Sequence, residues 1–124
     1  MNAENLRYHL INSEGLYTLP EYDMPCSTVL HDNIFDNDAL ILENSGVSAV
    51  SLSDGGKKYL TVRFDAKVFG IWSPAKKNAP FVCIEPWVAR PSRSGEPEDI
   101  MEKADMIHLQ RGEGYRNTYV ITVE

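Results

Sequence analysis

The middle of the chain alternates between hydrophobic and polar residues with a period of two. Residues 47–53 are Val-Ser-Ala-Val-Ser-Leu-Ser and residues 59–64 are Tyr-Leu-Thr-Val-Arg-Phe, with Asp-Gly-Gly-Lys-Lys between them. Successive side chains of a β-strand point to opposite faces, and glycines favour a tight turn. Alternation on both sides of a glycine-rich turn is typical of a β-hairpin, so we predict one over residues 47–64.

Shorter stretches of the same kind lie on both sides of this hairpin. They predict strands near residues 7–11, 39–43, 68–72, 80–85, 106–109 and 115–123. The last is the clearest, because Tyr119, Ile121 and Val123 share one face. One short helix is predicted at residues 96–103, where a proline in the first turn is followed by acidic residues.

The element pattern indicates an all-β protein. Seven or eight short strands with tight turns and at most one short helix favour an antiparallel β-sandwich or barrel. The 124 residues contain no repeat and no linker, so we predict a single domain over residues 1–124. Residues 1–30 are weakly patterned, as expected of a segment that pairs with strands absent from the chain.

Charge and cysteine spacing exclude several classes of protein. The net charge is −6 and the basic residues are scattered, whereas a nucleic-acid interface needs clustered positive charge. No apolar run approaches the ~20 residues of a membrane-spanning helix. Cys26 and Cys83 lack metal-type spacing, and no charged-then-apolar leader opens the chain. We therefore expect a cytoplasmic protein with no nucleic-acid partner, no membrane partner and no disulfide framework.

Glu85 lies in an unusual setting, the run Phe-Val-Cys-Ile-Glu-Pro-Trp at residues 81–87. Alternation places Cys83 and Glu85 on one face of a strand. Pro86 cannot donate a hydrogen bond, so we expect regular pairing to fail there and the strand to end or to reach a sheet edge. A half-buried carboxylate facing a concave site could act as a general base. The alternative is an ordinary acid at a strand end, pointing into water.

Trp72 and Trp87 are candidates for the walls of such a site. An indole has a flat apolar face and one N–H donor, which suits the C–H faces and hydroxyl groups of a sugar ring. The alternative is that each is a core residue, which is the more common role of a tryptophan taken singly.

Asp38 ends a turn that carries three aspartates and a histidine before an apolar strand. The turn does not match a calcium-binding EF-hand loop, because a bulky residue stands where that loop needs glycine. We predict that Asp38 accepts hydrogen bonds from the hydroxyl groups of a ligand. The alternative is a solvated turn.

The three histidines indicate no metal site. No two of them have the i, i+2 or i, i+4 spacing of metal ligands, so we expect each to be a surface or hydrogen-bonded residue: His9, His31 and His108. The chain also lacks a phosphate-binding glycine loop and a nucleophile elbow. We expect neither a metal ion nor a cofactor.

Four segments together resemble the C-terminal part of the aldose 1-epimerases, the galactose mutarotase-like family, over roughly residues 30–124. They are Phe-Asp-Asn-Asp-Ala-Leu-Ile at 35–41, Phe-Gly-Ile-Trp-Ser at 69–73, Pro-Phe-Val-Cys-Ile-Glu-Pro-Trp at 80–87, and a closing Leu-x-x-Gly-Glu at 109–113 before Tyr-Val-Ile at 119–121. The Ile-Glu-Pro-Trp step is the most specific of these.

The resemblance implies part of a β-supersandwich that binds a monosaccharide of the glucose or galactose type. Such an isomerase of carbohydrate metabolism interconverts the α and β anomers of an aldohexose without a cofactor. The residue matching Glu85 is then the general base, the one matching Asp38 holds sugar hydroxyls, and Trp72 lines the cleft. Trp87 would form a second apolar wall.

The chain departs from the family in two respects. The catalytic histidine and a sugar-binding arginine of the family lie in an N-terminal half that has no counterpart here, and neither His9 nor His31 lies in the family's histidine motif. Residues 89–92 are Ala-Arg-Pro-Ser where many relatives have Gly-Arg-x-Asp. We therefore expect a mutarotase-like protein without its general acid, which assembles with copies of itself or with a complementing N-terminal half. The alternative is a non-catalytic carbohydrate-binding or oligomerising β-domain.

Overall fold

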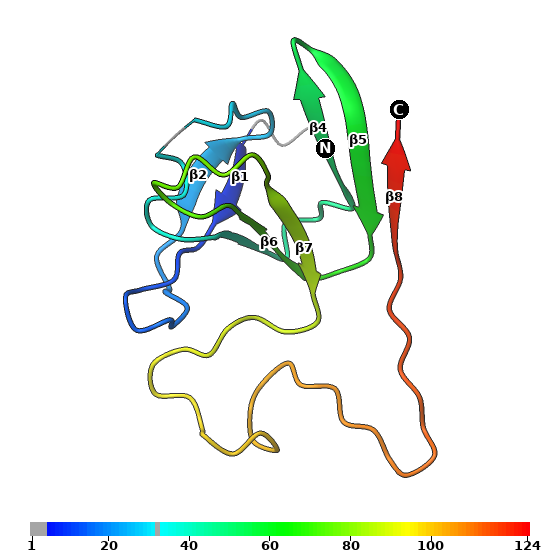
Figure 1. Ribbon diagram of the computed structural model, residues 1–124. Helices are drawn as coiled ribbons and strands as arrows, with labels where there is room; N and C mark the ends of the chain where they lie inside the picture. Colours follow the sequence, from blue (N-terminus) through cyan, green and yellow to red (C-terminus); the bar gives the residue numbers. More distant parts are fainter. Residues whose placement is uncertain (1–4, 32) are drawn as a thin grey trace.

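The computed structural model describes residues 5–31 and 33–124 and contains eight strands, all paired antiparallel (Figure 1). They form three sheets, with the orders β1-β2, β3-β6-β7 and β4-β5-β8. The strands are β1 (Asn5–Tyr8), β2 (Tyr22–Pro25), β3 (Leu40–Glu43), β4 (Ala49–Asp54), β5 (Lys57–Phe64), β6 (Val68–Trp72), β7 (Cys83–Trp87) and β8 (Tyr119–Val123).

The main core lies between the two three-stranded sheets. Leu42 and Phe69 from the β3-β6-β7 sheet pack with Val62 and Phe64 from β5, and the rings of Phe64 and Phe69 are 5.0 Å apart. Strands β1 and β2 add partly buried residues to the same cluster. Two facing antiparallel sheets around one apolar layer make a β-sandwich, which confirms the predicted all-β fold class.

The opposite face of the β3-β6-β7 sheet carries a smaller apolar cluster. Buried Ile41 and Val68 pack there with Tyr17, which reaches over the sheet from the segment between β1 and β2. We call this side the site face and define it by the paired rows Glu43–Val68–Trp87, Ile41–Gly70–Glu85 and Trp72–Cys83. Residues paired across antiparallel strands share a face, so each of these rows points to the same side.

Several predicted strands are confirmed. The hairpin over residues 47–64 is β4 and β5, the strand at 68–72 is β6, and the one at 39–43 is β3 with a start one residue later. The strand at 7–11 is β1, displaced toward the N-terminus, and β8 occupies the end of the stretch at 115–123. No strand forms at 106–109, and β2 was not predicted because Tyr-Asp-Met-Pro is only four residues long and ends in proline.

The predicted helix at residues 96–103 is wrong, and the part of the chain that the structure describes contains no helix. An isolated helix of two turns is marginal in water, because nucleation is costly. Here the Glu96 carboxylate instead accepts a hydrogen bond from the backbone N–H of Arg93 at 3.1 Å and pairs with Arg90. The segment between β7 and β8 therefore runs as turns below the sheets before it returns along β5 (Figure 1).

Pairing does not fail at Pro86, contrary to our expectation. Strand β7 continues through Pro86 to Trp87, with Phe69 opposite Pro86. The expectation that this strand reaches a sheet edge is confirmed, since β7 is the edge strand of its sheet. An edge strand accommodates proline because the missing N–H can face away from the neighbouring strand.

Candidate functional site

Glu85 stands on the site face beside both tryptophans. It lies opposite Gly70, and the neighbouring rows place Trp72 opposite Cys83 and Trp87 opposite Val68. Glu85 is half-buried, while Ile84 points to the other side and packs against the main core. The predicted sharing of a face by Glu85 and Cys83 is confirmed.

The Trp87 indole holds the Glu85 carboxylate from one side. Its Nε1–H donates a hydrogen bond to Glu85 Oε2 at 3.2 Å. The ring lies against Gly70, where an added Cβ would stand 2.7 Å from Trp87 Cζ2. The sequence analysis did not single out Gly70, although a glycine inside a strand often marks a close approach of another group. Gly70 thus makes room for the indole that orients Glu85.

Cys83 approaches Glu85 from the other side. Burial raises the pKa of the Cys83 thiol, and both the charge of Glu85 and a hydrogen bond to it act in the same direction. The thiol therefore stays protonated, where it donates to the carboxylate and is a poor nucleophile. Glu85 consequently has a donor on each side, and a carboxylate with two oxygens still has lone pairs left for a ligand.

Trp72 and Trp87 belong in part to the core. Both are half-buried and pack against the cluster of Ile41 and Val68. The interpretation as core residues therefore describes the buried part of each ring. Their contact with a sugar stays a prediction.

Asp38 lies just before β3, at the end of the sheet where Trp72 pairs with Cys83. It is exposed and has a left-handed backbone with φ of 72°. Its Oδ1 accepts a hydrogen bond from the Ala39 N–H at 2.7 Å, as aspartate does in tight turns. One carboxylate oxygen thus stabilises the turn, and its role toward sugar hydroxyls stays a prediction.

One histidine faces the same side as Glu85, at a distance. The backbone of His9 is bridged to Ile41, which continues the row through Gly70 to Glu85. The row spans three strand-to-strand spacings, so the backbones of His9 and Glu85 lie ~14 Å apart. The His9 ring lies 4.6 Å from the ring of Tyr17, and its Nδ1 lies 3.1 Å from the carbonyl oxygen of Thr18. From this position His9 cannot act on the same sugar carbon as Glu85.

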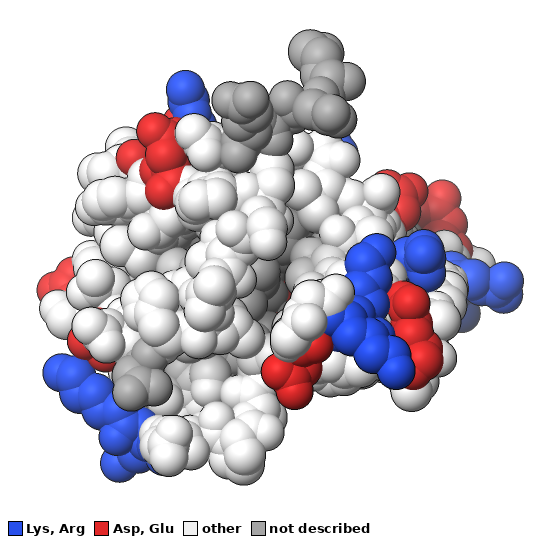
Figure 2. All heavy atoms as spheres, turned by 90° about the horizontal axis from the view of Figure 1, so that it is seen from above, with Lys and Arg blue, Asp and Glu red and all other residues white. Residues whose placement is uncertain are grey.

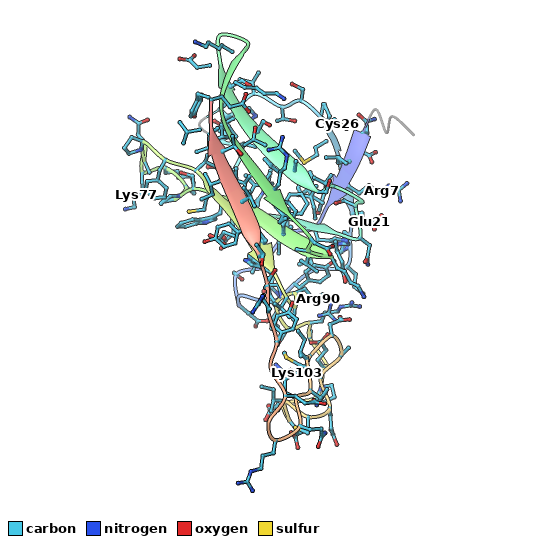
Figure 3. The ribbon with its side chains drawn as sticks, turned by 90° about the vertical axis from the view of Figure 1, so that its right-hand side faces the viewer. Arg7, Glu21, Cys26, Lys77, Arg90 and Lys103 are labelled. Carbon is cyan, nitrogen blue, oxygen red and sulfur yellow. The ribbon has the colours of Figure 1, made fainter. Side chains whose placement is uncertain are left out.

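The site face is bordered by a cluster of charges that the sequence analysis missed. The Tyr17 hydroxyl donates to Glu43 Oε2 at 2.7 Å, and burial, followed by the bond to Glu43, raises the pKa of Tyr17. The guanidinium of Arg90 lies 5.4 Å from the centre of the Tyr17 ring and pairs with Glu96. The contact between Arg90 and Tyr17 ties the segment after β7 to the N-terminal part of the chain. Within that segment, where Figure 3 labels Arg90 and Lys103, Lys103 Nζ donates a hydrogen bond to Ser92 Oγ at 2.6 Å.

A surface hollow lies near the site face, but Glu85 is not among the residues that line it. This hollow of about 580 Å³ lies beside the β6–β7 connection, where Tyr59, Lys76 and Phe81 line it, and His31 lies at its border. On the face seen in Figure 2 the charged side chains lie mainly toward the margins, where basic groups stand beside acidic ones. Trp87 of the site face lines a second hollow, with Lys67 and Asp105.

Neither a metal centre nor a membrane span is found in the described ranges. No group of three or more His, Cys, Asp or Glu side chains is placed to hold a metal ion there. None of the described segments forms a helix long and apolar enough to cross a membrane.

Comparison with known proteins gives one structural match. A solved structure of a galactose mutarotase related enzyme from Lactobacillus acidophilus matches the chain with a TM-score of 0.83 and 29% sequence identity. The match covers 99% of this chain and 43% of that enzyme, so the chain spans less than half of the enzyme's length. No family model and no curated protein matches the chain. In fold and in sequence the chain resembles a galactose mutarotase-related enzyme, which confirms the predicted resemblance to the aldose 1-epimerase, galactose mutarotase-like, family.

Proposed function

We propose that the chain binds an aldohexose on the site face and promotes the exchange of its α and β anomers, with Glu85 as the proton acceptor. The observation that carries the proposal is the placement of a half-buried carboxylate between two indoles on one sheet face. The match to a galactose mutarotase related enzyme supports the same chemistry. The cytoplasmic location predicted from the cysteine spacing is kept as part of this proposal.

Ring opening requires two proton transfers and no cofactor, and ring closure reverses both transfers. Glu85 removes the proton of the anomeric hydroxyl, the bond between that carbon and the ring oxygen breaks, and the ring oxygen receives a proton. After the open-chain carbonyl rotates, the ring oxygen loses its proton as it attacks the carbonyl carbon, and Glu85 returns its proton to the carbonyl oxygen, which gives the other anomer. The Nε1–H of Trp87 keeps the carboxylate oriented, since it donates to Glu85 Oε2. Trp72 and Trp87 pack against the C–H faces of the sugar, and Asp38 accepts hydrogen bonds from its hydroxyl groups.

The proton for the ring oxygen comes from outside the described site face. The backbone of His9 lies ~14 Å from that of Glu85 in the same row. This is too far for both side chains to act on oxygens of the same sugar carbon. Water, a complementing N-terminal half or a second copy of the chain would have to supply the acid. A positioned base alone contributes ~10²–10⁴-fold to a proton transfer. We therefore expect slow catalysis by the isolated chain.

The distance of His9 favours a second candidate function, sugar binding without turnover. In that case Glu85 and Asp38 act only as hydrogen-bond acceptors for sugar hydroxyls. Binding without turnover would change the fluorescence of Trp72 and Trp87 while leaving the rate of anomer exchange unchanged.

Polarimetry on fresh α-glucose and α-galactose tests the proposal. The wild-type chain should accelerate the change in rotation, and Glu85→Gln should remove most of that acceleration, by ~10²-fold or more. Glu98→Gln, which alters an exposed acid in the segment after β7, is the matched control and should behave as wild type. Equal rates for wild type and Glu85→Gln would contradict the catalytic role. A saturable fluorescence change without acceleration would support the binding function instead.

A further inference from the structure

Strand β8 is an edge strand that leaves its apolar side chains uncovered. Tyr119, Ile121 and Val123 are 58%, 55% and 80% exposed. They stand opposite Phe64, Val62 and Leu60 of β5, which belong to the main core, and so they continue the core face of that sheet beyond the sandwich. Figure 1 shows β8 at the margin of the molecule, with β5 on one side only.

Each of the other sheet edges has a feature that discourages pairing with another chain. Charged residues, proline and bulges are the usual means by which proteins protect such edges. At least one of them occurs in each of the remaining edge strands of the described chain: Arg7 in β1, Asp23 and Pro25 in β2, Glu43 in β3, a bulge at Leu52/Ser53 and Asp54 in β4, and Glu85 with Pro86 in β7. Strand β3 is also covered in part by its bridge to His9. Strand β8 has no charged residue, proline, glycine or bulge.

The backbone of β8 presents a regular row of donors and acceptors to the open side. The N–H of Glu124 donates to the carbonyl of Tyr59 at 3.1 Å, which shows that even-numbered residues bond to β5. In an antiparallel ladder the intervening residues direct both backbone groups away from that neighbour. The N–H and C=O groups of Tyr119, Ile121 and Val123 therefore face the free edge.

We propose that β8 pairs antiparallel with β8 of a second copy of this chain, about a two-fold axis at Ile121. In this register Ile121 meets Ile121 of the other copy, and Tyr119 meets Val123, so every outward backbone group finds a partner. No charge stands opposite a like charge along the five paired residues, because the strand is uncharged. The pairing joins two β4-β5-β8 sheets into one and brings their exposed apolar rows together. It is a case of β-strand addition and is independent of the proposed sugar chemistry.

Second copies fit this edge better than an unrelated chain because the strand is self-complementary under two-fold symmetry. A symmetric dimer uses the same patch on both partners, and here that patch has matching backbone register and matching apolar side chains. The Pro86 edge of β7 fits less well, since its proline offers no N–H and its Glu85 would place charge in the ladder.

Sedimentation velocity of the wild-type chain over a range of concentrations tests the proposal. A species of twice the 14.0 kDa chain mass should form on concentration and dissociate on dilution. Ile121→Pro removes an N–H that faces the free edge and leaves the bonds to β5 in place, so it should stay at 14.0 kDa. Ile121→Lys, which places two like charges at the axis, should weaken association by at least ~10-fold. Ala49→Glu, which adds a charge at an exposed position of the edge strand β4 opposite Arg63, is the matched control and should dimerise as wild type.

A wild-type chain that stays monomeric throughout would overturn the proposal, as would a folded Ile121 variant that dimerises like wild type. Circular dichroism establishes whether each variant is folded. If neither variant folds, hydrogen exchange of the wild-type chain decides the question. The amides of Ile121 and Val123 should be protected in concentrated samples and lose that protection on dilution, and equal exchange at both concentrations would refute the pairing.

Discussion

Gly70 is the position where a single methyl group should disturb the site face most. The Trp87 ring covers Gly70 on the site face. A Cβ at residue 70 would lie 2.7 Å from Cζ2 and 3.0 Å from Cη2 of that ring. Ordinary contacts between such carbons are ~3.5–4.0 Å long. In Gly70→Ala the indole or the backbone must therefore move by close to 1 Å.

The size of the effect follows from how the indole is held. Trp87 packs against the cluster of Ile41 and Val68 and donates to Glu85 at 3.2 Å, so it cannot swing aside without losing both kinds of contact. Forcing an extra carbon into a well-packed region costs about 1–3 kcal/mol. We expect Gly70→Ala to lower the free energy of unfolding by about 2 kcal/mol and to weaken any function that depends on Glu85.

Urea denaturation followed by circular dichroism measures this loss. The matched control is Gly114→Ala, because an added Cβ there meets nothing within 4 Å. Where the backbone accepts it, alanine for glycine restricts the unfolded chain and stabilises by about 0.4–1 kcal/mol, so Gly114→Ala should be neutral or slightly stabilising.

A double-mutant cycle with Trp87→Ala identifies the cause. With the indole removed, the added methyl group has no ring to displace, and most of the cost of Gly70→Ala should disappear. An equal loss with and without the Trp87 ring, or a Gly70→Ala variant as stable as the Gly114→Ala control, would refute the reasoning.

Two further predictions concern the charge cluster that borders the site face. Tyr17→Phe keeps the buried ring but removes the donor to Glu43, and should lower the free energy of unfolding by about 2 kcal/mol; an unchanged urea midpoint would show that the bond contributes nothing. The hydrogen-bonded Arg90 guanidinium holds the pKa of Glu96 below its ordinary value of 4.5. The unfolded chain thus takes up this proton more readily, so the ion pair stabilises fully above pH 4.5 and its contribution is lost as the pH falls through the lower, folded-state pKa. Glu96→Gln should cost about 3 kcal/mol at pH 7 and much less in acid, as thermal unfolding at both pH values can measure; a difference from wild type that is the same at both would contradict this assignment.

The local pattern was sufficient to predict the strands in which hydrophobic and polar residues alternate along the chain. The hairpin of β4 and β5, strand β6 and the shared face of Glu85 and Cys83 were predicted because a period of two depends only on the pleat of a strand. The helix at 96–103 was predicted wrongly for the same reason. Local propensity favoured it, but Arg90 and Arg93, which lie outside the segment, bind Glu96.

The sequence by itself determined that the chain is all-β and that Glu85 lies beside an indole, because strand periodicity and neighbouring residues in the chain set both. Only the tertiary structure decided that Trp87 rests on Gly70, that His9 stands three strands away from Glu85, and that β8 ends the sheet uncovered. Those facts depend on which strands pair and in which register. Pairing joins residues far apart in the chain, so no local pattern can specify them.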